Sequence, residues 1–502
     1  MQPQQSIFDH QPTERLQFKI DQVLNLSFNS ICIKGFFCQT LCYFLIIFVM
    51  QQEQYILTSF NGYKFVENFV KIFPIMFLVS YEIPEFFEQY FANKKMATYA
   101  TGESVQDINR QEFATNCIVA ILMLAIPAAQ PAIFSVLQVD SEYRAMFLLS
   151  TVLGIVGPFK STVYSVFSLK QNYVYIMAGK MVTLMIHFFL FTFIYSFNMR
   201  ETGFNTWPSG FSKPMAEIII HVIMLIVLYK GSIFSTKISL EADQTAKISL
   251  LPQRKDWKEI GKNILAFLQH LVFYVSRPIV YLFIVYKIIN LKIESIKQDA
   301  IIDLYVYIFC QQSLSLISKG IHSAIMTIMP ILFHQKQYHK MRRLIIYSSL
   351  FGLIFNEIIN AILIFNPNVI FYLFFGSNNS IISNYKSKQG YIAILSKTAL
   401  LFGTEVYQTV QITYSHITKK HYVPLIIGLI RIIGGVYFVM NLDSCLGQSA
   451  RYDDVFFYFE LLSTIIAAIF TVYMHISMYT EYKMEVKAKV KKIKAKDDFM
   501  LK

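Results

Sequence analysis

Two short basic segments, Phe167–Tyr173 (FSLKQNY) and His416–Tyr422 (HITKKHY), each close a long apolar stretch of this chain. The first begins at position 167 and the second at position 416, so a shift of 249 positions superimposes them. The same shift places Gly154 on Gly403. These matches predict that the chain of 502 residues consists of two similar halves.

The composition is typical of a protein that lies in lipid. Hydrophobic residues make up 55% and charged residues 15%, with a mean hydropathy of +0.44, whereas about a quarter of the residues of a soluble protein are charged. A bilayer core about 30 Å thick requires about 20 apolar helical residues per crossing. Twelve stretches meet this requirement: 28–50, 65–91, 114–137, 145–168, 174–197, 215–236, 264–291, 301–333, 344–365, 390–414, 421–441 and 455–479.

These stretches predict an all-α polytopic membrane protein with 12 transmembrane helices in two six-helix lobes. Short alternating strands, which are typical of membrane barrels, do not occur. Each half has six crossings, an even number, so both halves begin on the same side of the membrane. The two repeats are therefore parallel. We expect five parts: a cytoplasmic N-terminal segment (1–27), an N-lobe (28–236), a cytoplasmic linker (237–263), a C-lobe (264–479) and a basic cytoplasmic tail (480–502).

The distribution of basic residues predicts the orientation. With a cytoplasmic N-terminus, the inside segments hold 26 of the 45 Lys and Arg residues and the outside loops hold 9. Positive charge collects on the cytoplasmic side, so we expect both termini there, in a membrane that the sequence does not identify. The net charge of +13 thus reports topology and not nucleic-acid binding. The lysines of the tail, Glu481–Lys502, favour either an anionic lipid surface or a protein partner.

Several function classes are disfavoured. Five of the six cysteines lie inside predicted crossings, so no disulfide framework follows. The chain has no Gly-Lys-Ser/Thr phosphate-binding sequence, no His/Cys cluster with metal-ligand spacing and no large extramembrane domain. We therefore expect no enzyme activity, no metal site and no organic cofactor.

The turns at the ends of the crossings resemble those of the MATE (multidrug and toxic compound extrusion) family of the MOP flippase superfamily. Met329–Arg343 has the length and the basic ending of the turn that follows the second crossing of each MATE lobe, although its small residues are mostly missing. Phe374–Ile382 is similar to the outer-loop segment before crossing 10. The resemblance covers most of the chain and implies two lobes that rock about a central cavity.

Glu405 is the strongest candidate for chemistry inside the membrane. An ionisable residue at mid-membrane depth costs at least about 2.5 kcal/mol, so it faces a polar cavity or has a partner. Tyr407, Gln408 and Gln411 follow it, and the glutamines share its helical face. The resemblance implies an acid at this place in crossing 10. Glu405 could carry a coupling proton, balance a cationic substrate or be a structural carboxyl group.

Crossing 7 departs from the MATE pattern. The family places a Glu about eight residues after a Pro, but counting from Pro278 reaches Tyr286, with Lys287 next. Three possibilities stay open: Glu405 alone couples transport, another residue substitutes, or transport is uncoupled. Lys287 could also pair with Glu405, and Tyr286 could stack on an organic cation.

Further polar residues are candidates for a cavity lining. Glu82 and Glu85 lie in crossing 2, and two interpretations are open: they line an N-lobe cavity, or they pair with Lys160 or Lys180. Glu88, nearer the cytoplasmic end, is expected to be solvated. Gln311 and Gln312 are cavity candidates in crossing 8.

The leading hypothesis is a secondary transporter that exports small organic, mainly cationic, compounds in exchange for H⁺ or Na⁺. One alternative is a flippase for lipid-linked substrates, which requires a cationic cavity. Another is a transporter fold that serves as a structural subunit of a larger membrane complex. The degraded turns and the missing acid of crossing 7 favour that last alternative.

Overall fold

A computed structural model gives the structure of the chain. It describes residues 30–100, 106–169, 173–201, 206–229, 251–314, 320–321, 325, 328–334, 336–366, 405–441, 458, 461–462, 465–466, 468–484 and 486–487. Every regular element within these ranges is a helix, so the all-α prediction is confirmed.

The described part of the chain consists mostly of helices. They are α2 (Ser30–Phe77), η1 (Leu78–Glu82), α3 (Ile83–Ala100), α4 (Gln106–Met123), α5 (Ala125–Ala128), α6 (Gln130–Leu137), η2 (Ser141–Tyr143), α7 (Arg144–Leu169), α8 (Tyr173–Glu201), α9 (Trp207–Tyr229), η3 (Arg254–Asp256), α10 (Trp257–Ile289), α11 (Glu294–Leu314), α13 (Met329–His334), α14 (Tyr338–Phe365), α18 (Glu405–Thr418) and α19 (Tyr422–Met440).

Gly62 divides α2 into two helical segments. Its φ of 57° and ψ of −138° lie in a region that glycine adopts without a steric penalty. The sequence predicted a loop over 51–64, and this was wrong, because the helix continues up to Gly62. Polar residues lower the hydropathy there, but Leu57 and Thr58 are buried in the bundle, and their packing extends the helix.

The predicted crossing 114–137 is also not one continuous helix. It is divided among α4, the short α5 and α6, with breaks after Met123 and at Ala129. Pro127 and Pro131 lie in this region, and each lacks the N–H group that would continue the helical hydrogen bonds. The average hydropathy of a stretch of residues does not show where a helix is interrupted.

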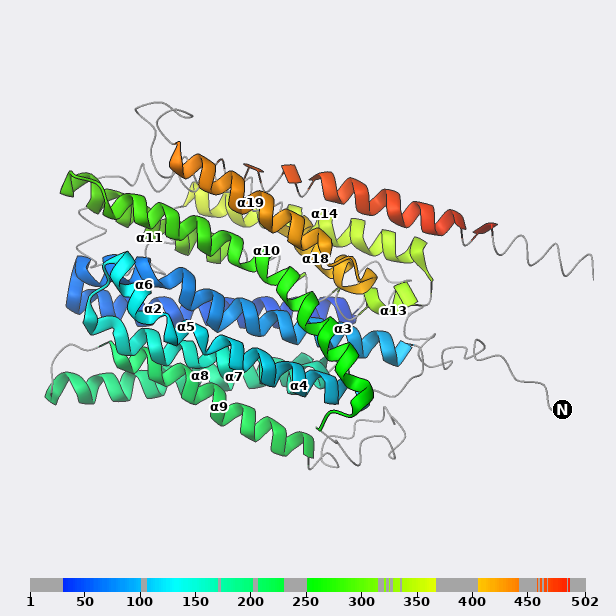
Figure 1. Ribbon diagram of the computed structural model, residues 1–502, viewed down its shortest axis with the longest axis horizontal. Coiled ribbons are helices and arrows are strands. Elements are labelled where there is room, and N and C mark those ends of the chain that lie inside the picture. The colour runs from blue at the N-terminus through cyan, green and yellow to red at the C-terminus, as the bar shows by residue number, and fades with distance from the viewer. Residues whose placement is uncertain are drawn as a thin grey trace, which may run out of the picture.

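The helices lie roughly along one axis in two groups (Figure 1). α2 to α9 form the N-lobe group, and α10 to α19 form the C-lobe group. α10 joins the groups, because its first turns contact α4 while the helix as a whole packs on α19. The end of the molecule that holds the end of α3, the start of α10 and the end of α18 is called the predicted cytoplasmic end below.

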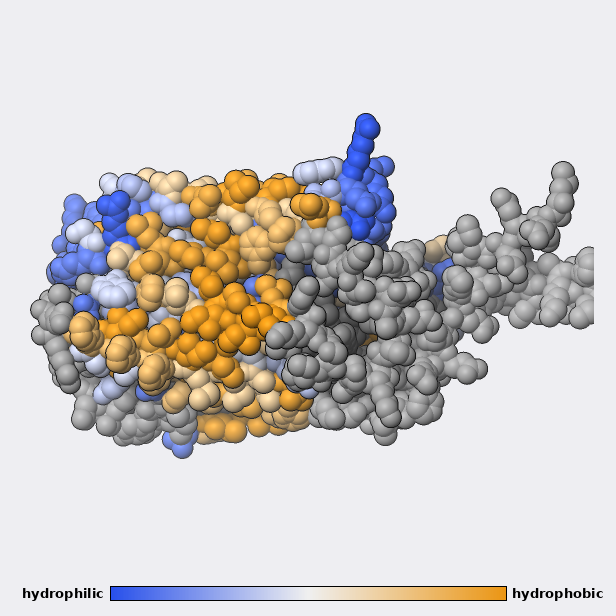
Figure 2. Space-filling view, turned by 90° about the horizontal axis from the view of Figure 1, so that it is seen from below, coloured by the Kyte–Doolittle hydropathy of each residue, from blue (hydrophilic) through white to orange (hydrophobic). Residues whose placement is uncertain are grey.

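The described surface of α8 and α9 is strongly apolar. Figure 2 shows this face, where hydrophobic side chains form a band across the middle of the molecule and hydrophilic residues gather towards its ends. Met185, Phe189 and Phe193 are each more than 60% exposed. Six helical segments of the described chain are long and apolar enough to cross a membrane: Asp107–Ala128, Ser141–Ser165, Val174–Met199, Trp207–Ile226, Arg254–Ile289 and Tyr422–Met440. Such a band of exposed apolar residues suits contact with lipid.

Small residues bring α7 close to the helix that carries the candidate site. A side chain at Gly154 would clash with Val79, and one at Gly157 would clash with Pro84. Membrane helices use such residues because van der Waals packing drives their association. The close contact holds η1 and the start of α3 against α7.

Candidate functional site: a charged cavity in the N-lobe

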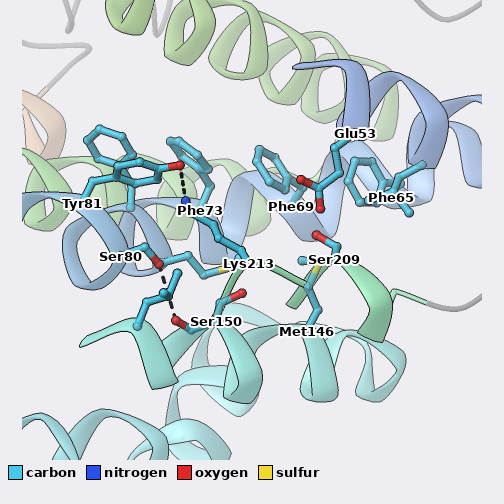
Figure 3. Close-up of a pocket in the computed structure, with 14 residues that line it drawn as sticks. Glu53, Phe65, Phe69, Phe73, Ser80, Tyr81, Met146, Ser150, Ser209 and Lys213 are labelled. Carbon is cyan, nitrogen blue, oxygen red and sulfur yellow. Dashed lines mark hydrogen bonds between the residues drawn. The ribbon is translucent and has the colours of Figure 1, made fainter. Parts of the chain in front are cut away.

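Two adjoining cavities of about 60 Å³ and about 70 Å³ lie inside the N-lobe group. They share Ser80, Tyr81 and Lys213, so we treat them as one feature, the N-lobe cavity. The first part is mainly aromatic on one side, where Phe65, Phe69 and Phe73 line it (Figure 3). The charged lining of the second part consists of Glu85, Glu88, Lys160, Lys180, Lys213 and Glu217, with His187 beside them.

A π-helical turn presents Ser80 and Tyr81 to this cavity. The turn is η1, Leu78–Glu82, and it directly precedes the turn that contains Pro84. Proline has no N–H group and interrupts the regular α-helical bonding of the preceding turn. Single π-helical turns are common at functional sites. Ser80 Oγ donates a long hydrogen bond of 3.5 Å to the carbonyl oxygen of Ser150, which links η1 to α7 (Figure 3).

Ion pairs fill the charged part of the cavity. Lys160 of α7 pairs with Glu217 of α9, and both side chains are less than 20% exposed. Lys180 of α8 lies 3.5 Å from Glu88 of α3. A buried pair is costly to break, because the remaining charge loses its partner without regaining water. The pairs therefore link α3, α7, α8 and α9 around one polar interior.

His187 of α8 links α2 and α9. Its Nε2 atom lies 3.1 Å from Oε2 of Glu53, and its Nδ1 atom lies 3.0 Å from Oγ of Ser212. Both ring nitrogens thus have a partner, as expected for a buried histidine. Glu53 reaches the cavity from the segment of α2 that lies before Gly62.

Lys213 differs from the other lysines of the cavity. Its Nζ atom donates to the hydroxyl group of Tyr81 and lies 3.5 Å from the centre of that ring. Among the described residues it forms no ion pair, although Glu217 is one helical turn away on α9 and Glu53 lines the same space. Lys213 therefore lies beside two carboxylates that have other partners and has no fixed carboxylate of its own among the described residues.

Of the two predicted acids of crossing 2, Glu85 lines this cavity, and Glu82 is not among the lining residues. Glu85 accepts a hydrogen bond of 2.9 Å from Nε2 of Gln89. Glu82 ends η1 and is half-buried. Lys160 and Lys180, the partners considered for Glu82 and Glu85, form ion pairs with Glu217 and Glu88. The expectation that Glu88 is solvated was wrong, because its side chain is only 14% exposed and is paired with Lys180.

For six of the predicted C-lobe residues, the structure describes only the backbone. Glu405 is the first residue of α18, which also contains Tyr407, Gln408 and Gln411, and Gln311 and Gln312 belong to α11; the side chains of these six residues lie outside the described part. Tyr286, 48% exposed, and Lys287 lie in the last turns of α10. The assignment of all these residues to a site stays a prediction.

Sequence reasoning did not select Glu53, Lys213 or Glu217. Glu53 lies in the segment that was predicted to be a loop, and Lys213 lies just before the predicted start of crossing 6. Glu217 falls inside that crossing, and an ionisable residue in an apolar stretch is the signal that could have identified it. Its pairing with Lys160, 57 positions earlier, is not visible in the sequence.

Polar side chains join the two lobes at the predicted cytoplasmic end. Tyr90 and Lys94 of α3 both donate to Oδ1 of Asn263 on α10, over 3.0 Å and 2.9 Å. Arg110 of α4 lies 3.0 Å from the buried carboxylate of Asp256, just before α10. Burial lowers the pKa of the Lys94 ammonium group to about 8. α10 starts at Trp257 and not at 264 as predicted, because these contacts order its first turns.

Comparison with solved structures reveals the same architecture. A eukaryotic MATE transporter, AtDTX14, superimposes with a TM-score of 0.67 over 94% of this chain and 100% of its own, at 10% identity. An outward-facing MATE multidrug-resistance transporter gives a TM-score of 0.68 over 90% of this chain and 96% of its own, at 11% identity. A MOP-superfamily transporter from Pyrococcus furiosus, for which reversed polarity of the binding pocket suggests a different function, gives 0.65 over 89% and 96%, at 12% identity.

The chain has the MATE fold. The match spans nearly the whole chain, so the predicted arrangement of two six-helix lobes is confirmed. With its apolar helices, the MATE fold makes this an integral, multi-pass membrane protein. No protein-family model matches the sequence, and no curated protein matches it significantly.

Proposed function

We propose that this protein is a secondary transporter that exchanges H⁺ or Na⁺ for small organic, mainly cationic, compounds by rocking its two lobes. The observation that carries the proposal is a MATE fold with a network of buried ionisable side chains inside one lobe. Ionisable groups in a membrane interior are costly and are retained where ions or substrates pass. The network therefore supports a role in transport more than a purely structural role.

The size of the N-lobe cavity suits an ion and water. Its two parts measure about 60 and 70 Å³, whereas sites for drug-sized molecules measure about 300–1,000 Å³, and one water molecule takes about 30 Å³. We assign the exchange of the coupling ion to this cavity. Lys213 and the pairs Lys160–Glu217 and Lys180–Glu88 would rearrange as a proton or Na⁺ enters and leaves.

The organic solute would bind elsewhere, between the lobes. Glu405 remains the proposed acid of the C-lobe, with Tyr407, Gln408 and Gln411 on the same helix. In this scheme the N-lobe cavity binds and releases the coupling ion, and the C-lobe acid balances the charge of the solute.

The charge of the cavity bears on the flippase alternative. A site for a phosphate-bearing lipid headgroup needs an excess of positive charge. The charged part of the cavity has three lysines and three glutamates, so it does not favour an anion. The N-lobe cavity therefore gives no support to the flippase alternative, and it does not select the charge of a solute that binds between the lobes.

Reconstituted liposomes test the proposal. Protein-mediated movement of ethidium, used as a probe cation, is measured under an imposed pH gradient and, separately, under an imposed Na⁺ gradient. We expect movement under one gradient in the wild type, and at least a tenfold loss in both Lys213→Met and Glu405→Gln. Glu142→Gln, at an exposed position on η2, serves as the matched control.

The proposal fails if the wild type moves no ethidium under either gradient and Glu405→Gln behaves identically. Stoichiometric co-purification of other subunits with such an inactive protein would support the structural-subunit alternative. If Glu405→Gln is inactive but Lys213→Met transports normally, ion exchange in the N-lobe cavity is the part that fails.

A further inference from the structure

Three histidines that are distant in the sequence meet at the predicted cytoplasmic end. His270 belongs to α10, His416 to α18, and His421 to the turn before α19. One ring nitrogen of each residue lies within 4.8 Å of those of the other two. His270 and His416 are buried, and His421 is half-buried. The N-lobe cavity and the predicted C-lobe residues do not include any of them.

One pair of nitrogens lies at a hydrogen-bond distance that is also close to the ligand spacing of a metal site, and all three nitrogens lie within 4.8 Å of one another. The Nε2 atom of His270 lies 3.1 Å from Nδ1 of His421. Tetrahedral Zn²⁺ with Zn–N bonds of about 2.0–2.1 Å places neighbouring ligand nitrogens about 3.4 Å apart. The other ring nitrogen of His270, Nδ1, is buried without a hydrogen-bond partner within the described part of the chain.

Aromatic side chains of α3 enclose the cluster. The ring of Phe86 lies 5.3 Å from that of His270 and 5.4 Å from that of His416, and Tyr90 lies 5.6 Å from His416. Neutral imidazole is the form that binds metals. A set of three imidazoles suits Zn²⁺, Cu²⁺ or Ni²⁺, whereas Mg²⁺ and Ca²⁺ prefer oxygen ligands.

We propose that His270, His416 and His421 bind a divalent transition-metal ion, with Zn²⁺ as the first candidate and water as the fourth ligand. The rings of His270 and His416 are stacked, 4.0 Å apart at 7°. The lone pair of an imidazole nitrogen lies in the ring plane, so the His416 ring tilts out of this stack when the ion binds. A bound ion ties α10 to α18 and to the turn before α19, at the place where these helices contact α3.

Direct metal titration of the full-length protein tests the site. The protein is purified in detergent, stripped of metal with a chelator and titrated with ZnCl₂ by calorimetry. We expect one site per chain with a dissociation constant of about 1 µM or below, a range that includes the structural zinc sites of proteins. Each of His416→Gln and His421→Gln should weaken binding about 100-fold or more, whereas His339→Gln, at an exposed histidine of α14, should not change it.

Cobalt gives a second readout that does not depend on transport. Co²⁺ bound by three histidines and water in a four-coordinate geometry absorbs visible light strongly, and His421→Gln should remove that spectrum. Size-exclusion chromatography confirms that each variant is folded; if His416→Gln is not, His421→Gln in the half-buried turn carries the test. Equal Zn²⁺ titrations for the wild type and His421→Gln, or a weak six-coordinate Co²⁺ spectrum, would overturn the proposal.

Discussion

Lys94 and Lys95 are neighbours on α3, yet they serve two different regions of the molecule. Lys95 points into the N-lobe, where its Nζ atom lies 2.6 Å from Oε2 of Glu112 and donates to Oγ of Ser165 over 2.7 Å. Both side chains of that ion pair are fully buried. Lys94 points towards the C-lobe, where it donates to Asn263 and lies 3.8 Å from Glu259, and its side chain is 25% exposed.

The difference indicates which contacts are fixed and which can open. A fully buried pair is costly to separate, because each charge would remain in a medium of low dielectric constant. Partly exposed contacts exchange with water at little cost. The Lys95–Glu112 pair therefore keeps one lobe rigid, whereas the partly exposed Lys94–Glu259 contact between the lobes is one that the proposed rocking motion would break and remake.

The largest expected effect comes from the fixed region. Lys95→Met leaves Glu112 buried without its partner, and we expect the free energy of unfolding to fall by about 3–5 kcal/mol. Denaturation in mixed micelles measures this change. The double variant Lys95→Met/Glu112→Leu should recover a large part of the loss, since it removes both charges. If the single variant is as stable as the wild type, the Lys95 region does not fix the lobe.

The second effect is the pH dependence of stability that Lys94 causes. The folded-state pKa of Lys94 is lowered from 10.5 to about 8, mainly by burial. Between these values the unfolded chain binds a proton that the folded chain does not, so stability rises with pH across this window. At about 1.4 kcal/mol per pKa unit, and with reduction by solvent, we expect a gain of about 1–3 kcal/mol. Stability measured from pH 7 to pH 10.5 should lose this rise in Lys94→Met and keep it in Lys483→Met, a control at an exposed tail lysine.

The third effect tests a single hydrogen bond between the lobes. Tyr90→Phe removes the hydroxyl group that donates to Asn263, and we expect a loss of about 1 kcal/mol. Tyr422→Phe provides the control, because it removes an exposed hydroxyl contact with Tyr473. Equal losses in thermal unfolding for the two variants would contradict a specific role for the bond to Asn263.

The smallest effect is expected at the opposite end of the molecule. Lys64 lies 3.1 Å from Glu142, but the two side chains are 46% and 58% exposed. Water competes for such a pair, so Lys64→Met should leave the melting temperature unchanged within error. A clear decrease would show that exposure does not separate the fixed contacts from the weak ones.

The fold was predictable because few backbone structures are stable in lipid. Apolar stretches of about 20 residues must be helical to satisfy their backbone groups, and the repeat between Phe167–Tyr173 and His416–Tyr422 indicated two lobes. The bounds were less accurate. Buried Leu57 extends α2 through the predicted loop 51–64, and Pro127 lies where the predicted third crossing is interrupted. Both effects depend on packing or on local hydrogen bonds, which average hydropathy does not describe.

The candidate site was predictable only in part. Glu85 was selected because an acid inside a crossing is costly, and it lines the N-lobe cavity. Its neighbour Glu88 was expected in solvent, since distance along the helix is a poor guide to burial when Lys180 of another helix covers the position. Lys213 was assigned to a loop, because its charge lowered the local hydropathy that marks a crossing.

The sequence by itself determined that this protein lies in lipid, that it is all-helical and that its two halves are similar. These properties depend on composition and on periodicity along the chain. Only the tertiary structure decided which charges meet: Lys160 with Glu217, Lys95 with Glu112, and His270 with His416 and His421. Pairing energies depend on distance and burial in three dimensions. To predict these pairs, one must know which way each side chain points from its helix and which helix packs against that face.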